Sequence, residues 1–533
     1  MNTKTRQKAG VSRVSIDGFI GARKDYACQY YYKDVPGVSE QSLPQSQPEA
    51  IGRTSVPGPP SPPVPTADRG SSGQLHFDLP AYTAPKRPRA VVRKKRLWRQ
   101  RFVRFSAVAT SCVLLVGGVL FWRGYISIQK VFQGTHTVAA LSGDKVPPEL
   151  LEGEGDGRVN VLLLGVGGQN HDGGDLTDTI MVLSVDPVNN KAAMLSIPRD
   201  LWVKMPVNYF GAYQKINAAY SSGKYKYLGK SDLANTNQAA VEAGFASISK
   251  AVSMVLGIRI NYHVVVDFQA FSQAVDTVNG VTLDVKEQLY DPTMAWENAN
   301  NPVLAPVGVQ TMDGKRALMY ARSRKTSSDF DRSERQRQLL FALKQKVISL
   351  DTLSSPAKID SLLRTFRENV RTDLTTKAAT RLATIMRSID DDDIASLSLT
   401  APDSLVTTDR VGNISVVRPR AGFDMYSDIQ AYVRSQLQDG YLVKEKANVY
   451  VVAATEQARL ATVETLSGYG YAVSGSVAGQ ELPAGTNIVD LTSGAKPYTL
   501  HYLQDRYGSA ATRSLPSGVD VPDGVQFVIL VGI

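Results

Sequence analysis

Cysteine and histidine are scarce in this chain of 533 residues, which has two cysteines and five histidines. Cys28 lies near the amino terminus and Cys112 lies in an apolar stretch, so the rest of the chain needs no disulfide framework. The histidines are scattered without the spacing of a zinc site: His76, His136, His171, His263 and His501.

Acidic residues are absent from residues 86–104, a segment that holds ten of the lysines and arginines. The formal net charge of the whole chain is +10, so this one segment accounts for the excess and the rest is close to neutral. Nothing outside the segment has the clustered positive charge that nucleic-acid binding requires, and we expect no nucleic-acid partner.

Charge is also absent from residues 105–122, an apolar stretch of 18 residues. At about 1.5 Å per residue a helix of this length spans roughly 27 Å, close to the hydrocarbon core of a bilayer. We therefore predict a single transmembrane helix here, with 86–104 as a basic juxtamembrane segment. By the positive-inside rule the amino terminus is cytoplasmic and the chain beyond Gly124 is extracellular.

Proline, serine and glycine dominate much of residues 1–85, a composition that cannot bury enough apolar surface to offset chain entropy. We predict a disordered cytoplasmic tail, and a proline-rich docking site for a partner is the alternative. Residues 124–155, beyond the predicted span, are interpreted as a linker.

The stretch richest in candidate functional residues begins with an apolar strand at Val159–Leu164. A glycine-rich acidic turn with Asp175 and Asp178 follows, and after two more predicted strands comes Arg199. Carboxylate oxygens suit Mg²⁺, and a guanidinium matches phosphate oxygens, so this pattern indicates phosphate chemistry. The alternative is structural: Asp178 and Thr179 cap a turn, and Arg199 forms a surface ion pair.

A second cluster of arginines lies between a predicted short helix, 313–321, and a helix that runs to about residue 350. Its members are Arg322, Arg324, Arg332, Arg335 and Gln336. The last three are three and four residues apart, so they share one helical face. Arginines that open a helix oppose its dipole, and a bound anion that offsets their charge explains them better than a solvated face does.

With these motifs, and with Lys215–Tyr220 and Asp276–Val285, the chain resembles the LytR-CpsA-Psr family of cell-wall glycopolymer transferases over roughly residues 156–350. The resemblance implies transfer of a glycopolymer from a polyprenyl pyrophosphate carrier to peptidoglycan, with help from Mg²⁺. It implies an apolar pocket for the lipid tail. It assigns phosphate contacts to Arg199, Arg322, Arg324 and Arg332, a place beside them to Arg335 and Gln336, and a metal to Asp178.

Two positions depart from the family pattern. The family places an Asp where this chain has Gly167, and an Arg where it has Leu176. One metal ligand and one phosphate contact are therefore missing from their expected places. His171, Asp172 or Asp175 is then the replacement ligand, and Asp175 is favoured because it lies nearer Asp178 in the sequence.

Strands alternate with helices from residue 156 to 440, which predicts an α/β sandwich around a mixed sheet. The predicted helix Gln238–Leu256 carries apolar residues that either form core or line the lipid pocket: Phe245, Ile248, Val252 and Val255. Residues 447–533 predict a small α/β domain that resembles the carboxyl-terminal domain often found in this family. It shows no paired acid and base, so we expect a binding or positioning role for this domain rather than a second activity.

The sequence thus predicts a membrane-anchored phosphotransferase. Two alternatives are a pyrophosphatase that acts on polyprenyl pyrophosphate, and a non-catalytic wall-binding or regulatory protein.

Overall fold

The computed structural model describes residues 134, 137–143, 145–168, 173–229, 237–323, 329–348, 370–400 and 404–532, all of which belong to one compact unit. The predicted tail, basic segment and membrane span lie outside these residues, as do His171, Asp172 and Arg324.

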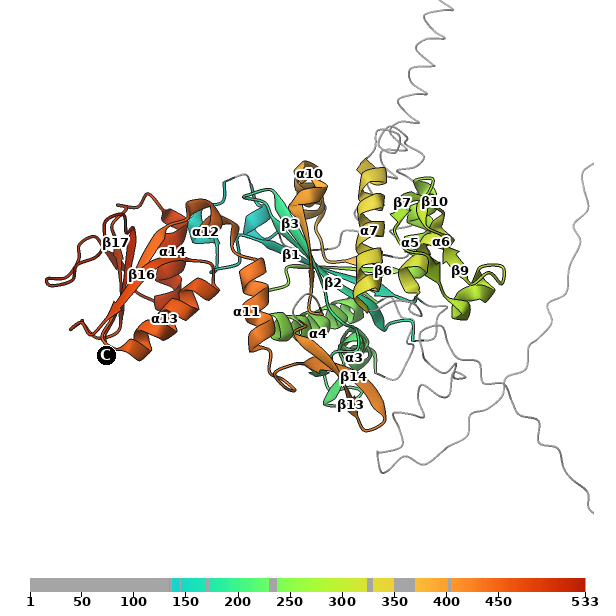
Figure 1. Ribbon diagram of the computed structural model, residues 1–533, viewed down its shortest axis with the longest axis horizontal. Coiled ribbons are helices and arrows are strands. Elements are labelled where there is room, and N and C mark those ends of the chain that lie inside the picture. Colours follow the sequence, from blue (N-terminus) through green and yellow to red (C-terminus); the bar gives the residue numbers. More distant parts are fainter. Residues whose placement is uncertain are drawn as a thin grey trace, which may run out of the picture. The chain divides into compact units, whose positions relative to one another are not determined.

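A six-stranded mixed sheet forms the centre of the protein, in the order β11-β6-β1-β2-β3-β12 (Figure 1). Its strands are β1 Val159–Val166, β2 Thr177–Asp186, β3 Lys191–Ser196, β6 Tyr262–Asp267, β11 Val370–Thr372 and β12 Ile394–Ser398. The strand β1 is parallel to β6 and antiparallel to β2, and β3 is antiparallel to β2 and parallel to β12. This confirms the predicted mixed α/β fold.

Both faces of the sheet are apolar, because successive side chains of a strand point to opposite faces and both sets are hydrophobic here. In β1, Leu162 and Leu164 belong to one core cluster, and Val159 and Val161 belong to another. Helices cover each face, which makes a three-layer sandwich.

The first face is covered by α3 Ala219–Leu228, α4 Gln238–Leu256 and α11 Ser427–Gln436 (Figure 1). The helix α4 begins where the Asn237 side chain accepts bonds from two backbone N–H groups and ends at Gly257, which has a φ of 70°. Within the described ranges α4 is the one helix long and apolar enough to cross a membrane, but its apolar face is buried in this core. Phe245, Ile248, Val252 and Val255 all lie in that core.

The opposite face is covered by α10 Thr376–Ser388 and by partly buried residues of α7 Asp329–Ile348. Residues 370–436 thus supply two strands of the central sheet and a helix on each face. The hairpin β13 Val406–Val411 with β14 Ile414–Pro419 in this region was not predicted.

A small subdomain next to α7 has its own core and carries the second arginine cluster. It consists of α5 Phe268–Thr277, β7 Val281–Val285, β8 Leu289–Tyr290, η4 Pro292–Glu297, β9 Val303–Ala305, β10 Gly308–Met312 and α6 Gly314–Arg322. The strand β7 pairs with β10, and β8 pairs with β9. The Asp313 side chain caps α6 by accepting from the Arg316 N–H.

The carboxyl-terminal module has a five-stranded sheet in the order β16-β15-β19-β17-β18. Its elements are α12 Gly440–Glu445, β15 Asn448–Ala453, α13 Glu456–Gly468, β16 Ala472–Ala478, β17 Thr486–Asp490, α14 Pro497–Tyr507, β18 Ala511–Thr512 and β19 Phe527–Val531. Val146 and Leu151 pack into its core, so the described part of the expected linker is integrated into folded structure.

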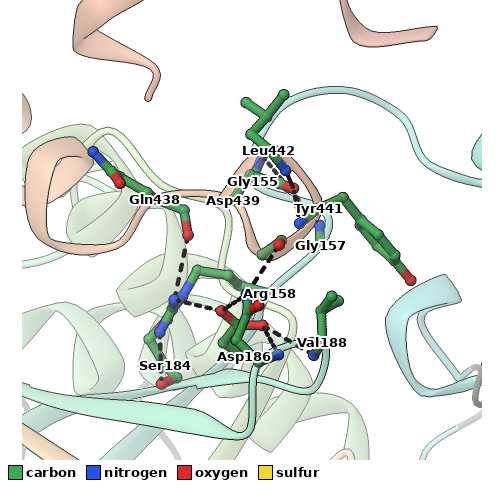
Figure 2. Close-up of polar contacts among 12 residues, drawn as sticks. Gly155, Gly157, Arg158, Ser184, Asp186, Val188, Gln438, Asp439, Tyr441 and Leu442 are labelled. Carbon is green, nitrogen blue, oxygen red and sulfur yellow. Dashed lines mark hydrogen bonds and ion pairs between the residues drawn. The ribbon is translucent and has the colours of Figure 1, made fainter. Parts of the chain in front are cut away.

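A buried polar junction connects this module to the central sheet (Figure 2). Arg158, directly before β1, donates to Ser184 Oγ at 2.8 Å and lies 3.6 Å from Asp186. The Asp439 carboxylate is 2% exposed. It accepts four backbone N–H bonds and a phenol O–H, from Gly155, Gly157, Tyr441, Leu442 and Tyr502. Burial raises the pKa of Asp439, and the N–H donors offset part of that rise.

Candidate functional site

The sheet topology brings Asp178 and Arg199 together. Because β2 is antiparallel to β3, the start of β2, which carries Asp178, lies beside the end of β3, which leads to Arg199. The Arg199 guanidinium donates to the Asp178 carboxylate. Arg199 is only 4% exposed. The structure thus gives Arg199 an ion pair, as the structural alternative expected, but a buried one at a sheet edge.

The segment that follows fixes the backbone beside Arg199. This segment contains β4 Trp202–Lys204, β5 Tyr213–Lys215 and η3 Ile216–Ala218. The Asn217 N–H donates to the Arg199 carbonyl at 3.2 Å, and Lys215 Nζ lies 2.8 Å from an Asp200 carboxylate oxygen. Thr177 Oγ1 donates to the Asn217 carbonyl at 3.1 Å. This part of the motif at 215–220 therefore has a structural role in positioning Arg199.

Asp175 is engaged by a lysine of α3. Both of its carboxylate oxygens accept from Lys224 Nζ, at 2.8 and 3.0 Å, and Lys224 is buried. The Tyr225 phenol also bonds Asp175, and burial together with this carboxylate raises the pKa of Tyr225. Sequence reasoning missed Lys224, which is 49 positions from Asp175.

The described residues do not form a complete Mg²⁺ site. Asp178 and Asp175, the predicted ligands, each have a cationic partner, Arg199 and Lys224. No group of three or more acidic, histidine or cysteine side chains suited to a metal occurs in the described part of the chain. Mg²⁺ binding therefore stays a prediction.

Arg322, the last residue of α6, is partly buried and forms a second part of the site. Its guanidinium lies 4.7 Å from the centre of the Phe268 ring, and its Nη1 lies 3.5 Å from a Glu297 carboxylate oxygen. Its Nε is buried and meets no hydrogen-bond acceptor among the residues that the structure describes. A partly buried guanidinium with an unused donor is suited to an anionic ligand.

Strand register places this arginine at the same sheet edge as Asp178. Phe268 follows Asp267, which pairs with Val166 across β6 and β1, and Val166 pairs with Thr177 across β1 and β2. Two strand spacings of about 4.8 Å separate Asp267 from Thr177, so roughly 10 Å of sheet edge connects the two arginine regions. Burial raises the pKa of Asp267, which sequence reasoning did not select.

Arg335 and Gln336 of α7 donate hydrogen bonds to backbone carbonyls at the end of α6. Arg335 is buried, and it donates from Nε to the Tyr320 carbonyl at 3.0 Å and from Nη2 to the Ser323 carbonyl at 2.6 Å. Gln336 Nε2 donates to the Ala321 carbonyl at 3.3 Å. Burial lowers the pKa of Arg335. These donors are occupied by backbone, so a direct phosphate contact for Arg335 and Gln336 stays a prediction.

The remaining residues predicted to contact phosphate are Arg332 and Arg324. Arg332 is buried on α7, and Arg324 lies outside the described residues. Sequence reasoning missed Asp291, which is buried and accepts from Ser323 Oγ at 2.8 Å, directly after Arg322. The Asp291-Pro292 pair marks a helix start, but no local signal reveals its distant partner.

The mixed sheet defines an α/β protein in which arginines and carboxylates gather at one sheet edge. The chain belongs to the LytR_cpsA_psr family, whose model matches residues 126–420. This confirms the resemblance drawn from the motifs. The carboxyl-terminal module lies beyond the matched residues.

The chain is similar to two transferases of Bacillus subtilis (strain 168). It is 32% identical over 229 residues to polyisoprenyl-teichoic acid–peptidoglycan teichoic acid transferase TagV, covering 43% of this chain and 52% of TagV. It is 27% identical over 316 residues to the transferase TagT, covering 58% of this chain and 89% of TagT. A crystal structure of B. subtilis TagV aligns with a TM-score of 0.40 and 27% identity, over 53% of this chain and 96% of that one.

Proposed function

We propose that this protein is a membrane-anchored phosphotransferase that moves a glycopolymer from a polyprenyl pyrophosphate carrier to a peptidoglycan hydroxyl. The observation that carries the proposal is the unused donor of Arg322, buried at the same sheet edge as the Arg199–Asp178 pair. Family membership and the transferase names of TagV and TagT support the same activity.

In this proposal the arginines offset the charge of the pyrophosphate. The oxygen of the acceptor hydroxyl forms a bond to the phosphorus that carries the polymer, and the bond from that phosphorus to the polyprenyl phosphate breaks. The hydroxyl proton passes to the leaving polyprenyl phosphate, directly or through water. Negative charge that develops on the leaving phosphate is stabilised by fixed donors in a partly dehydrated site. Asp178 orients Arg199, and Glu297 orients Arg322. Mg²⁺, held by Asp178 together with substrate phosphates, would stabilise further charge on the phosphate oxygens.

The membrane anchor is the predicted helix at 105–122, with the catalytic domain outside the cell. A membrane location suits a substrate with a polyprenyl tail, because the carrier stays in the bilayer while its pyrophosphate reaches the protein. The basic segment 86–104 supports the proposed orientation.

Single replacements of the two arginines test the proposal. One charge-assisted hydrogen bond is worth on the order of 1.5–3 kcal/mol, so Arg199→Ala and Arg322→Ala should each reduce transfer by roughly tenfold or more. Arg387→Ala is the matched control, because Arg387 is exposed on α10 and should leave transfer unchanged.

Product analysis with a labelled lipid-linked donor separates the candidate functions. Label that moves to glycan supports the transferase. Phosphate released without transfer supports the pyrophosphatase, and intact donor under all conditions supports a non-catalytic protein.

A further inference from the structure

The side chain of Trp296 is exposed to solvent, and packing within the subdomain does not explain this exposure. It lies in η4, between β8 and β9, and it is 65% exposed. An indole buries more apolar area than most side chains when it packs, so leaving it in water forgoes a large stabilisation. Tryptophan is enriched among the residues that carry most of the energy at binding interfaces, so an exposed indole is a candidate ligand contact.

The support beneath Trp296 is rigid. Asp291 caps η4 by accepting from the Thr293 N–H at 3.0 Å, and its other oxygen accepts from Ser323 at 2.8 Å. Met294 is fully buried in the subdomain core, and the Asn298 amide donates to two backbone carbonyls beyond η4. The indole therefore stands on a fixed turn, which lowers the entropy lost when a ligand binds.

Trp296 is also next to the candidate phosphate site. The following residue, Glu297, places a carboxylate oxygen 3.5 Å from Arg322 Nη1. Adjacent Cα atoms are about 3.8 Å apart, so the backbone that carries the indole lies beside the residue that contacts Arg322.

We propose that Trp296 binds a sugar ring of the substrate, with the C–H face of the ring stacked on the indole. This inference rests on the proposed function and extends it to a saccharide subsite. A sugar ring has an apolar face and a polar rim, which suits an indole that is partly exposed: the face is buried and the hydroxyls stay in water. The ring belongs either to the donor polymer or to the acceptor glycan strand.

The local charge favours a sugar over a lipid surface. Residues 287–314 contain no lysine or arginine and include Glu287, Asp291, Glu297 and Asp313. Segments that attach to anionic membranes combine aromatic residues with basic ones, and this stretch has no basic residue.

Kinetics of the full chain in detergent test the subsite. Trp296→Ala should raise the KM for one substrate about tenfold, which corresponds to about 1.4 kcal/mol, with kcat changed less than twofold. A higher KM for the acceptor glycan assigns the ring to the acceptor, and a higher KM for the lipid-linked donor assigns it to the polymer. Trp296→Phe retains an aromatic face and should recover most of the effect. Leu460→Ala, an exposed apolar residue of the carboxyl-terminal module, is the control and should change neither KM.

Binding without turnover separates this inference from the proposed function. Peptide-free glycan strands and acid-released wall polymer are the probes, and Trp296→Ala should weaken one of them about tenfold. Arg322→Ala should reduce transfer by roughly tenfold or more yet retain that binding. If the unmodified protein binds saccharide but shows no transfer, only the transferase is refuted. Unchanged binding of both saccharides by Trp296→Ala overturns the inference. So does a loss confined to phosphatidylglycerol vesicles, which would make the indole a membrane contact.

Discussion

Arg335 offers the sharpest test of a structural against a substrate-binding role. Family resemblance places it beside the phosphate, whereas in the structure it donates to two backbone carbonyls at the end of α6, at 3.0 and 2.6 Å. Arg335→Ala removes both bonds and leaves the carbonyls of Tyr320 and Ser323 without this donor. We expect a large loss of stability.

The size of that loss follows from the contacts. Hydrogen bonds from a charged donor contribute about 1.5–3 kcal/mol each, and relief of the buried charge offsets part of this. A net loss of about 2–4 kcal/mol remains, which corresponds to a drop in Tm of roughly 2–5 °C for a folded unit of about 400 residues. Arg337→Ala is the matched control on the same helix, because its pair with Glu334 is partly exposed and contributes about 1 kcal/mol or less.

Thermal unfolding of the full chain in detergent distinguishes the structural role of Arg335 from a phosphate-binding role. Transfer activity is measured on the same variants. A fall in Tm for Arg335→Ala, with activity per folded molecule reduced through the displaced Arg322, supports the structural role. An unchanged Tm with a tenfold loss of polyprenyl pyrophosphate binding would refute this reasoning and make Arg335 a phosphate ligand.

Three further predictions concern the junction, the metal and the topology. Asp439→Ala should lower the free energy of unfolding by about 3–5 kcal/mol, because five buried donors lose their acceptor; a change under 1 kcal/mol by thermal or denaturant unfolding would show that water replaces the carboxylate. Calorimetry should detect weak Mg²⁺ binding alone and clear binding with a polyprenyl pyrophosphate, and Asp178→Ala should abolish the latter; unchanged affinity in that variant removes Asp178 from the site. Asp175→Ala should affect metal affinity only if Asp175 leaves Lys224 when substrate binds. Protease added to spheroplasts should degrade residues 124–533 and spare the tail, and protection of the large part would reverse the proposed orientation.

The sequence by itself determined the elements whose pattern is local. The helix Gln238–Leu256 has the predicted bounds, because the period of its apolar residues and the flanking Asn237 and Gly257 are visible in the chain. The first three strands of the central sheet were also evident, since runs buried on both faces are apolar throughout. The hairpin β13–β14 was missed, although its two-residue turn Gly412-Asn413 is a sequence signal for a hairpin.

Tertiary structure decided the partners of the charged residues. Asp175 was predicted to hold a metal, but α3 brings Lys224 to both of its oxygens. Arg335 shares a helical face with Arg332, yet the packing of α7 against α6 turns it to backbone carbonyls. The physical reason is the same in each case: a buried charge must be compensated by whatever group the fold brings within about 3 Å, and that group is separated from it in the sequence.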